Sequence, residues 1–314
     1  MEKRKYLVSA TPHIRRRMSV EIQYLILLLA LVPSVVSSII FHTFPALLIL
    51  SVSILSCYVF DMFFSFIFLG HFSFRDFSSV ITGLVLGLVM PVQIPIYFLI
   101  IASLISTLVA KVLFGGEGKE LVHGAAFGAC VISALVAGFG TTLVAYSGVV
   151  GEVLSPLEIY AESGYGVVPI LDLFLGNAGG MLGTTCAIAS IVGFLILSIS
   201  GVFDFYIPVL SIVAFVIVTI FTKGVEGILP ELLTGSFLFV SVFMLPSHSS
   251  SPALWPAKAA YSVLFGALAA AVRVNYLFGE AGVLFCLLLM NILSPLLDML
   301  ASVFFRGRRA KKYE

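Results

Sequence analysis

The chain has few charged residues and few cysteines. Of its 314 residues, 11% are charged and 60% are hydrophobic, and the formal net charge is +1. One globular core could not hide this much apolar surface, so the composition excludes a soluble globular domain. The four cysteines form no CxxC pair, which argues against a disulfide framework and against an ordinary zinc or iron–sulfur site. The sequence therefore predicts an integral membrane protein.

Long apolar runs predict transmembrane helices. A span needs roughly 20 mostly apolar residues, and by this measure the chain is an all-α polytopic membrane protein with about ten spans. Two prolines, Pro91 and Pro95, interrupt the third and fourth spans, and the eighth is short enough to be broken. The predicted spans lie near 22–42, 45–69, 79–97, 98–114, 122–145, 179–200, 205–222, 232–248, 257–275 and 282–304.

One sequence pattern occurs twice. It consists of a Thr-Gly pair, an apolar run closed by Met and Pro, and a later Gly-rich turn. It begins at Thr82 and again at Thr234, and the turns lie near Gly115 and Gly279. Such duplication is typical of membrane proteins that hold a ligand or ion between repeats, although coincidence is the alternative because Gly and Leu are common here. Two repeats of about five spans each would be inverted relative to one another.

Basic residues predict the orientation. They gather before the first span and after the last, so the positive-inside rule places both termini in the cytoplasm. The connection at 146–178 then lies outside, and it carries acidic residues but no Lys or Arg. The predicted organisation is a cytoplasmic arm (1–21), a first transmembrane repeat (22–145), an outer loop (146–178), a second transmembrane repeat (179–304) and a basic cytoplasmic tail (305–314).

Several motifs together resemble a known family. They are the arm Ser9-Ala-Thr-Pro-His-Ile-Arg15, the segment Asp172-Leu-Phe-Leu-Gly176 and the segment Met290-Asn-Ile-Leu-Ser-Pro-Leu-Leu-Asp298. In order and spacing they resemble the membrane D subunits of Rnf electron-transport complexes and the homologous B subunits of sodium-pumping NADH:quinone reductases. The resemblance runs through nearly the whole chain. It implies a multi-pass protein of a bacterial or archaeal cytoplasmic (inner) membrane.

The resemblance implies a covalent flavin. In this family FMN is joined through its phosphate to a threonine hydroxyl, in a motif that precedes the Asp-Leu-Phe-Leu-Gly segment. The matching position here is Ser155, followed by Pro156, and a serine hydroxyl can form the same phosphoester. The residues before Ser155 depart from the family motif, and an alternative register at Ser163-Gly164 places no hydroxyl correctly. An ordinary Ser-Pro turn is the structural alternative.

A second, non-covalent flavin such as riboflavin is also implied by the resemblance. The family's Gly-Glu-Thr is replaced here by Gly183-Thr184-Thr185, and the residues after the first Gly-rich turn differ as well. Thr184 and Thr185 are candidates to hydrogen-bond a flavin, although small hydroxyl residues in a span more often serve packing.

Two carboxylates fall within predicted spans. Asp61 lies deep in the second span and Asp298 lies in the tenth. A charge at mid-membrane costs roughly 2.5–3.5 kcal/mol on insertion scales, so such residues usually face a cavity or a partner. Both are candidates for an ion path. The structural alternative is an interfacial or protonated carboxylate.

The resemblance implies a flavin-bearing subunit of an ion-translocating ferredoxin:NAD oxidoreductase. Electrons would pass through FMN, coupled to sodium or proton movement, and the subunit would not act alone. Its implied partners are the other complex subunits, including a second flavoprotein, with ferredoxin and NAD at the level of the complex. The alternatives are a transporter or channel built on the same inverted repeat, or a flavin-free scaffold subunit. No metal site and no nucleic-acid partner are expected.

Overall fold

The computed structural model shows a helical protein. It describes residues 20–69, 77–109, 112–115, 118, 120–138, 155–276 and 279–313. Residues 1–19 of the predicted arm and 146–154 of the predicted outer loop lie outside these ranges. No strand occurs among the described residues, which confirms the predicted all-α class.

Helices follow one another through the described residues, and several short helices lie between the long ones. In order they are α1 (Val20–Leu69), α2 (Phe77–Leu88), α3 (Ile96–Leu108), η1 (Val112–Phe114), α4 (Gly124–Gly138), α5 (Pro156–Ser163), α6 (Ile170–Leu175), α7 (Ala187–Ser200), α8 (Tyr206–Lys223), α9 (Ile228–Leu233), α10 (Phe237–Phe239), the π-helix η2 (Val240–Met244), α11 (Trp255–Val274), η3 (Gly279–Ala281) and α12 (Gly282–Tyr313).

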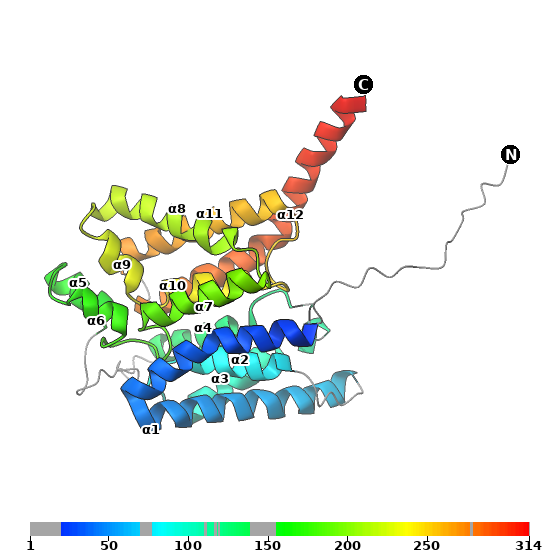
Figure 1. Ribbon diagram of the computed structural model, residues 1–314. Coiled ribbons are helices and arrows are strands. Elements are labelled where there is room, and N and C mark those ends of the chain that lie inside the picture. Colours follow the sequence, from blue (N-terminus) through cyan, green and yellow to red (C-terminus); the bar gives the residue numbers. More distant parts are fainter. Residues whose placement is uncertain are drawn as a thin grey trace.

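Most of the long helices run side by side. Figure 1 shows the bend of α1 at one end of the bundle, together with the short helices α5, α6 and α9. The start of α1 and the end of α12 lie at the opposite end. The first and the last described helix therefore have their terminal ends on the same side of the bundle, where the end of α12 projects away from the other helices (Figure 1).

Five stretches of described helix are long and apolar enough to cross a membrane. They are Val20–Phe68, Ile96–Phe114, Tyr206–Lys223, Trp255–Val274 and Gly279–Val303. Large apolar side chains also point outward, as at Ile199 and Phe221, which are 87% and 85% exposed. Lipid can cover such surface, whereas water would not. The chain is a multi-pass membrane protein.

Glycines let several helix pairs approach closely. A Cβ on Gly266 of α11 would lie 2.1 Å from the carbonyl oxygen of Ser211 in α8. A Cβ on Gly128 of α4 would lie 2.6 Å from the carbonyl oxygen of Ala102 in α3. Small residues at such crossings are the usual means of packing helices in lipid, where burial between helices gives little hydrophobic gain.

Helix breaks occur where the sequence predicts them. α2 ends at Leu88, ahead of Pro91, and α1 bends at Thr43, whose φ of 44° is unusual for a β-branched residue. The eighth predicted span is broken between α9 and α10, and it continues as a π-helix closed by a 2.8 Å bond from the Leu245 N–H to the Val240 carbonyl. Broken helices inside a membrane must satisfy their freed backbone groups internally.

Three predicted boundaries shift in the structure. The helix predicted near 179–200 begins only at Ala187, because the preceding residues pair with another segment through their backbone. The predicted outer loop contains α5 and α6, and α6 ends where Gly176 adopts a left-handed φ of 92°. The predicted tail continues α12 as far as Tyr313.

Candidate functional site

Two irregular segments meet at the centre of the candidate site. The Leu182 N–H donates to the carbonyl of Met90 at 3.0 Å, and the Gly183 N–H donates to the carbonyl of Leu88 at 2.7 Å. Pro91 and Met181 form an antiparallel bridge beside them. The end of α2 and the residues before α7 therefore satisfy each other's backbone groups, as a break inside a membrane requires.

This junction positions the two candidate threonines. Thr184 and Thr185 are 2% and 8% exposed. The Thr184 hydroxyl donates to the carbonyl of Met181 at 3.4 Å, and the methyl group of Thr185 lies beside Gly180. The Thr184 hydroxyl therefore supports the local turn, and Thr185 packs against the backbone.

Ser155 is the N-cap of α5. Its hydroxyl accepts from the Glu158 N–H at 3.4 Å, and the Glu158 carboxylate accepts from the Ser155 N–H at 2.8 Å. This is a capping box, with Pro156 at the first helical position, where its missing N–H costs nothing. Ser155 is fully buried. The Ser155 hydroxyl therefore lies at the start of α5 and is buried within the protein.

A buried cluster of charges lies beside this helix. The Glu231 carboxylate on α9 pairs with Lys223 of α8 at 2.5 Å and with Arg273 of α11 at 3.7 Å. The hydroxyls of Tyr165 and Tyr276 donate to the same carboxylate at 2.9 and 3.3 Å. Burial raises the pKa of the Tyr165 phenol, and the charge of Glu231 raises it further, so this phenol remains a hydrogen-bond donor.

Arg273 also closes the break between α9 and α10. Its guanidinium donates to the carbonyl oxygens of Glu231 and Thr234, at the end of α9, where no intrahelical donor remains. Gly235 follows with a φ of 67°, and a Cβ there would lie 2.9 Å from the guanidinium. The arginine occupies the space that a side chain at Gly235 would need.

Glu280 links the cluster to the backbone junction. It is fully buried, and its carboxylate accepts from the Met181 N–H at 3.1 Å. The Ser236 hydroxyl donates to the Glu280 carbonyl at 2.8 Å. The carboxylate also lies beside Gly180, next to Thr185. The structure therefore groups α5, the threonine segment and the break after α9 around one buried carboxylate.

The two predicted ion-path residues lie elsewhere. Asp61 is 4% exposed within α1. The Asp298 carboxylate accepts from the N–H groups of Ala253 and Leu254, at 2.8 and 3.0 Å, and so caps the start of α11. Arg273 is near the other end of α11, roughly 28 Å away at 1.5 Å per residue. Asp298 thus makes a helix-terminal contact far from the charge cluster.

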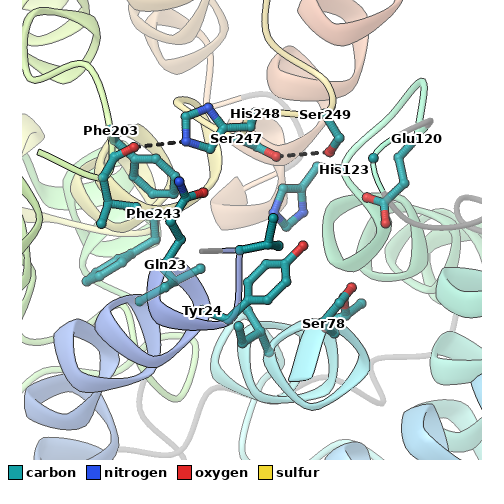
Figure 2. A pocket seen from close by; sticks show the side chains of 16 residues that line it. Gln23, Tyr24, Ser78, Glu120, His123, Phe203, Phe243, Ser247, His248 and Ser249 are labelled. Atoms are coloured by element: carbon teal, nitrogen blue, oxygen red, sulfur yellow. Dashed lines mark hydrogen bonds between the residues drawn. The ribbon is translucent and has the colours of Figure 1, made fainter. Parts of the chain in front are cut away.

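A cavity of about 480 Å³ opens between the start of α1, the start of α2 and the loops around α4 and η2. Its lining combines apolar side chains, among them Leu27, Ile81 and Phe243, with polar ones. Figure 2 shows His123 and Tyr24 facing this space. Separate segments of the chain form its wall, so no single motif predicts it.

The two histidines of the cavity differ in their bonding. His248 forms a 2.8 Å hydrogen bond through Nε2 with the carbonyl of Val202. The Nδ1 of His123 is buried without a hydrogen-bond partner, and burial lowers the pKa of His123 to about 4. His123 is therefore neutral at pH 7 and offers a ring nitrogen to a polar ligand.

Comparison of the sequence with known protein families identifies the family of this chain. The model of the NQR2, RnfD, RnfE family matches residues 7–304. The chain belongs to this family. The predicted resemblance is thus confirmed.

Relatives from this family cover most of the chain. The D subunit of the Na(+)-translocating ferredoxin:NAD(+) oxidoreductase complex of Acetobacterium woodii is 25% identical over 297 residues, which are 93% of this chain and 92% of the relative. The D subunit of the proton-translocating complex of Clostridium ljungdahlii is 27% identical over 317 residues, 95% of each chain. The B subunit of the Na(+)-translocating NADH-quinone reductase of Chlamydia felis is 33% identical over 156 residues, 44% of this chain and 31% of that relative.

Sequence reasoning missed the charge cluster of this NQR2, RnfD, RnfE family member. The cluster is formed by isolated charged residues in apolar sequence, Glu231, Arg273 and Glu280. From the sequence alone, each is interpreted as a charge at the membrane interface. The usable signal was that Glu231 falls just before the predicted break, where a partner must satisfy freed carbonyls. The pairing of these residues depends on three-dimensional contacts between α8, α9, α11 and η3.

Proposed function

We propose that the chain is the flavin-bearing membrane subunit of an ion-translocating ferredoxin:NAD oxidoreductase complex. It passes electrons through FMN, and turnover of the complex moves sodium ions or protons. The observation that carries this proposal is the family match over 7–304, together with two relatives, both D subunits, that cover more than nine-tenths of the chain. Flavins perform the electron chemistry, whereas the protein supplies position and electrostatics.

The partners are part of the same proposal. The chain works with the other subunits of the complex, including a second flavoprotein, and meets ferredoxin and NAD only at the level of the complex. The two relatives are named for different ions, Na(+) in one complex and protons in the other. The proposal therefore includes both sodium ions and protons as the transported ion. Asp61 and Asp298 remain proposed ion-path residues.

The topology is part of the proposal. About ten spans in two inverted repeats of about five helices, with both termini in the cytoplasm of a bacterial or archaeal cell, agree with the positive-inside rule. Two observations support it: each half contains a broken helix, α2 in one and α9–α10 in the other, and the start of α1 and the end of α12 lie at the same end of the bundle (Figure 1).

We place covalent FMN at Ser155 as a phosphoester between its Oγ and the FMN phosphate. The start of α5 suits a phosphate, because backbone N–H groups and the helix dipole favour negative charge there. Glu158 would have to swing away from the Ser155 N–H, because its carboxylate would repel a phosphate on the Ser155 hydroxyl. The residues that would hold the group are Ser155, Pro156 and the first turn of α5.

A second, non-covalent flavin such as riboflavin fits the cavity better than the threonine segment. The cavity of about 480 Å³ lies within the usual 300–1,000 Å³ range of ligand pockets and combines apolar side chains with polar groups such as His123. Thr184 is already bonded to Met181, and Thr185 packs against Gly180. We assign these threonines a supporting role.

Peptide mapping tests the covalent flavin. The subunit, purified with its native complex and denatured, should carry a mass gain of one FMN on the peptide that contains Ser155. Ser155→Ala should remove the gain and the yellow fluorescence of the denatured band. Ser163→Ala is the matched control, because Ser163 is exposed at the other end of α5 and should leave the label in place. An unlabelled Ser155 peptide in the native complex would refute the attachment.

A flavin-free scaffold subunit is the second candidate. One observation favours it: Ser155 is fully buried and already bonded as a helix cap. In that case the purified subunit releases no flavin at all, and Ser155→Ala changes the stability of α5 without changing electron transfer by the complex.

A further inference from the structure

Two glutamates in the same region are equally buried, but they differ in the number of ion-pair and hydrogen-bond partners around their carboxylates. Glu231 and Glu280 are 1% and 0% exposed. Glu231 has Lys223 and Arg273 as ion-pair partners and accepts from two tyrosine hydroxyls. Among the ion pairs of the described residues, none includes Glu280. The two carboxylates are therefore equally buried, but Glu231 has cationic partners in ion pairs and Glu280 has none among the described residues.

The surroundings of Glu280 supply one hydrogen bond to its carboxylate. Oε2 accepts from the Met181 N–H at 3.1 Å, and Oε1 is buried without a hydrogen-bond partner. Oε1 lies beside Gly180, 3.1 Å from the position that a Cβ would occupy there. The nearby Thr185 contributes its methyl group to this space. Neither neighbour offers a positive charge.

An ionised carboxylate in this position is costly. Removing a charge from water costs several kcal/mol even after relaxation, and one backbone N–H recovers only a part of this. A neutral carboxylic acid avoids most of the cost, because only the charged form carries the large desolvation penalty. We propose that Glu280 is a proton-binding site, in which Oε1 carries a proton at neutral pH.

A proton fits this site better than a metal cation. Hard cations need several oxygen ligands, whereas the partner of Oε2 is an N–H donor and Oε1 faces Gly180. Within the described ranges, no group of three His, Cys, Asp or Glu side chains could hold a metal ion. A carboxylic acid needs no such shell.

The neighbouring elements bring few groups that titrate or carry charge. Arg273 of α11 lies close enough to favour the ionised carboxylate, and Glu158 of α5 lies close enough to oppose it. Loss of the proton leaves a negative charge that Arg273 can compensate, since its Nε is buried without a hydrogen-bond partner. Three helical segments lie beside η3. Their titratable residues are Glu158, Tyr160 and Glu162 on α5, Cys130 on α4 and Cys286 on α12, apart from Asp298 and the basic C-terminal end of α12 (306–313).

This proton site does not depend on the flavin proposal. It rests on the burial and bonding of Glu280, and it holds whether Ser155 carries FMN or only caps α5. A failure of flavin attachment and a failure of this inference are therefore separate results.

Infrared difference spectroscopy tests the site. The full chain, purified with the subunits that accompany it, is compared with its Glu280→Gln and Glu231→Gln variants at neutral pH. Glu280→Gln should remove the C=O stretching band of one protonated carboxylic acid per chain. Glu231→Gln is the matched control and should leave that band unchanged, because the Glu231 carboxylate has two cationic partners.

Two results would overturn the proposal. One is an acid band that survives in Glu280→Gln, and the other is an acid band that is lost only in Glu231→Gln. If the Glu280→Gln variant does not assemble, the test is the infrared spectrum of the wild-type protein labelled with carboxyl-¹³C glutamate. It must show a protonated-acid band that shifts with the label at neutral pH, and the absence of such a band refutes the site.

Discussion

Arg273 reaches across from α11 and donates from Nη2 to the carbonyl oxygen of Thr234, 2.9 Å away. This bond joins a long helix to the break in its neighbour. The same guanidinium lies 3.7 Å from the Glu231 carboxylate, so one side chain both neutralises a charge and satisfies freed backbone groups. Removing it would take the donor from two buried carbonyl oxygens and leave Lys223 as the one cation paired with Glu231 among the described residues.

Arg273→Met should therefore strongly destabilise the protein. Truncating one member of a buried ion pair costs up to about 3–5 kcal/mol, and although Glu231 keeps Lys223, two buried carbonyl oxygens also lose their donor. Unfolding can be followed by a thiol-reactive dye, since all four cysteines are free and buried. Lys258→Met is the control: its partner Asp204 is 40% exposed, and an exposed pair contributes about 0–1 kcal/mol. Equal losses in both variants would contradict the role assigned to Arg273.

Gly266→Ala should loosen the contact between α8 and α11. On an exposed helix this change stabilises by about 1 kcal/mol, because alanine has the better helix propensity. Here the new Cβ would lie 2.1 Å from the Ser211 carbonyl oxygen, and overpacking costs about 1–3 kcal/mol or more. We expect a lower melting temperature, measured by the same dye. Ala260→Ser on the exposed side of α11 should leave it nearly unchanged. A rise in the melting temperature of Gly266→Ala would show that the two helices are further apart.

Stability should depend on pH through His123. Burial lowers the pKa of this imidazole to about 4 in the folded protein, from 6.5 when it is exposed. The unfolded chain therefore binds more protons between these values, and stability falls as the pH falls from 6.5 towards 4. The slope for one proton is at most about 1.4 kcal/mol per pH unit. Melting temperatures across this range should fall less steeply in His123→Asn than in the wild-type protein. Identical slopes would exclude His123 as the cause.

Asp298→Ala should weaken the start of α11. The carboxylate accepts from two backbone N–H groups ahead of Trp255, and loss of such a cap costs about 0.5–2 kcal/mol. Asp298→Asn keeps an acceptor oxygen and should recover part of the stability. Ion translocation by the complex separates the two roles: a capping role leaves it intact in Asp298→Asn, whereas an ion-path role abolishes it in both variants while Asp298→Asn remains folded.

The sequence predicted the parts of the fold that depend on apolar length and on proline. The long helices follow from hydropathy, the break near Pro91 from the missing N–H of proline, and the break in the eighth span from the shortness of its apolar run. The start of α7 at Ala187 was not predictable in this way, because the residues before it are apolar enough for a span. Their backbone bonds to Leu88 and Met90 appear only when the two halves are folded together.

The candidate site was predictable only where a family motif marks it. Ser155 and the threonine pair came from the family motifs, and the structure places α5 and Thr185 near Glu280. Glu280 itself lies in a Gly-rich turn, and nothing in that turn distinguishes a buried carboxylate from a solvated one. The cavity around His123 is formed by segments from both halves of the chain, so it has no local sequence signal.

The pairing of Met90 with Leu182 uses main-chain atoms alone, which affects how the protein can diverge. Main-chain hydrogen bonds tolerate most side-chain replacements, so this joint between the two halves places few demands on residue identity. The exception is Gly183, where a Cβ would lie 2.5 Å from the Leu88 side chain. Hybrid proteins that exchange halves with a relative as distant as 25% identity should therefore keep this joint, provided that glycine remains at this one position.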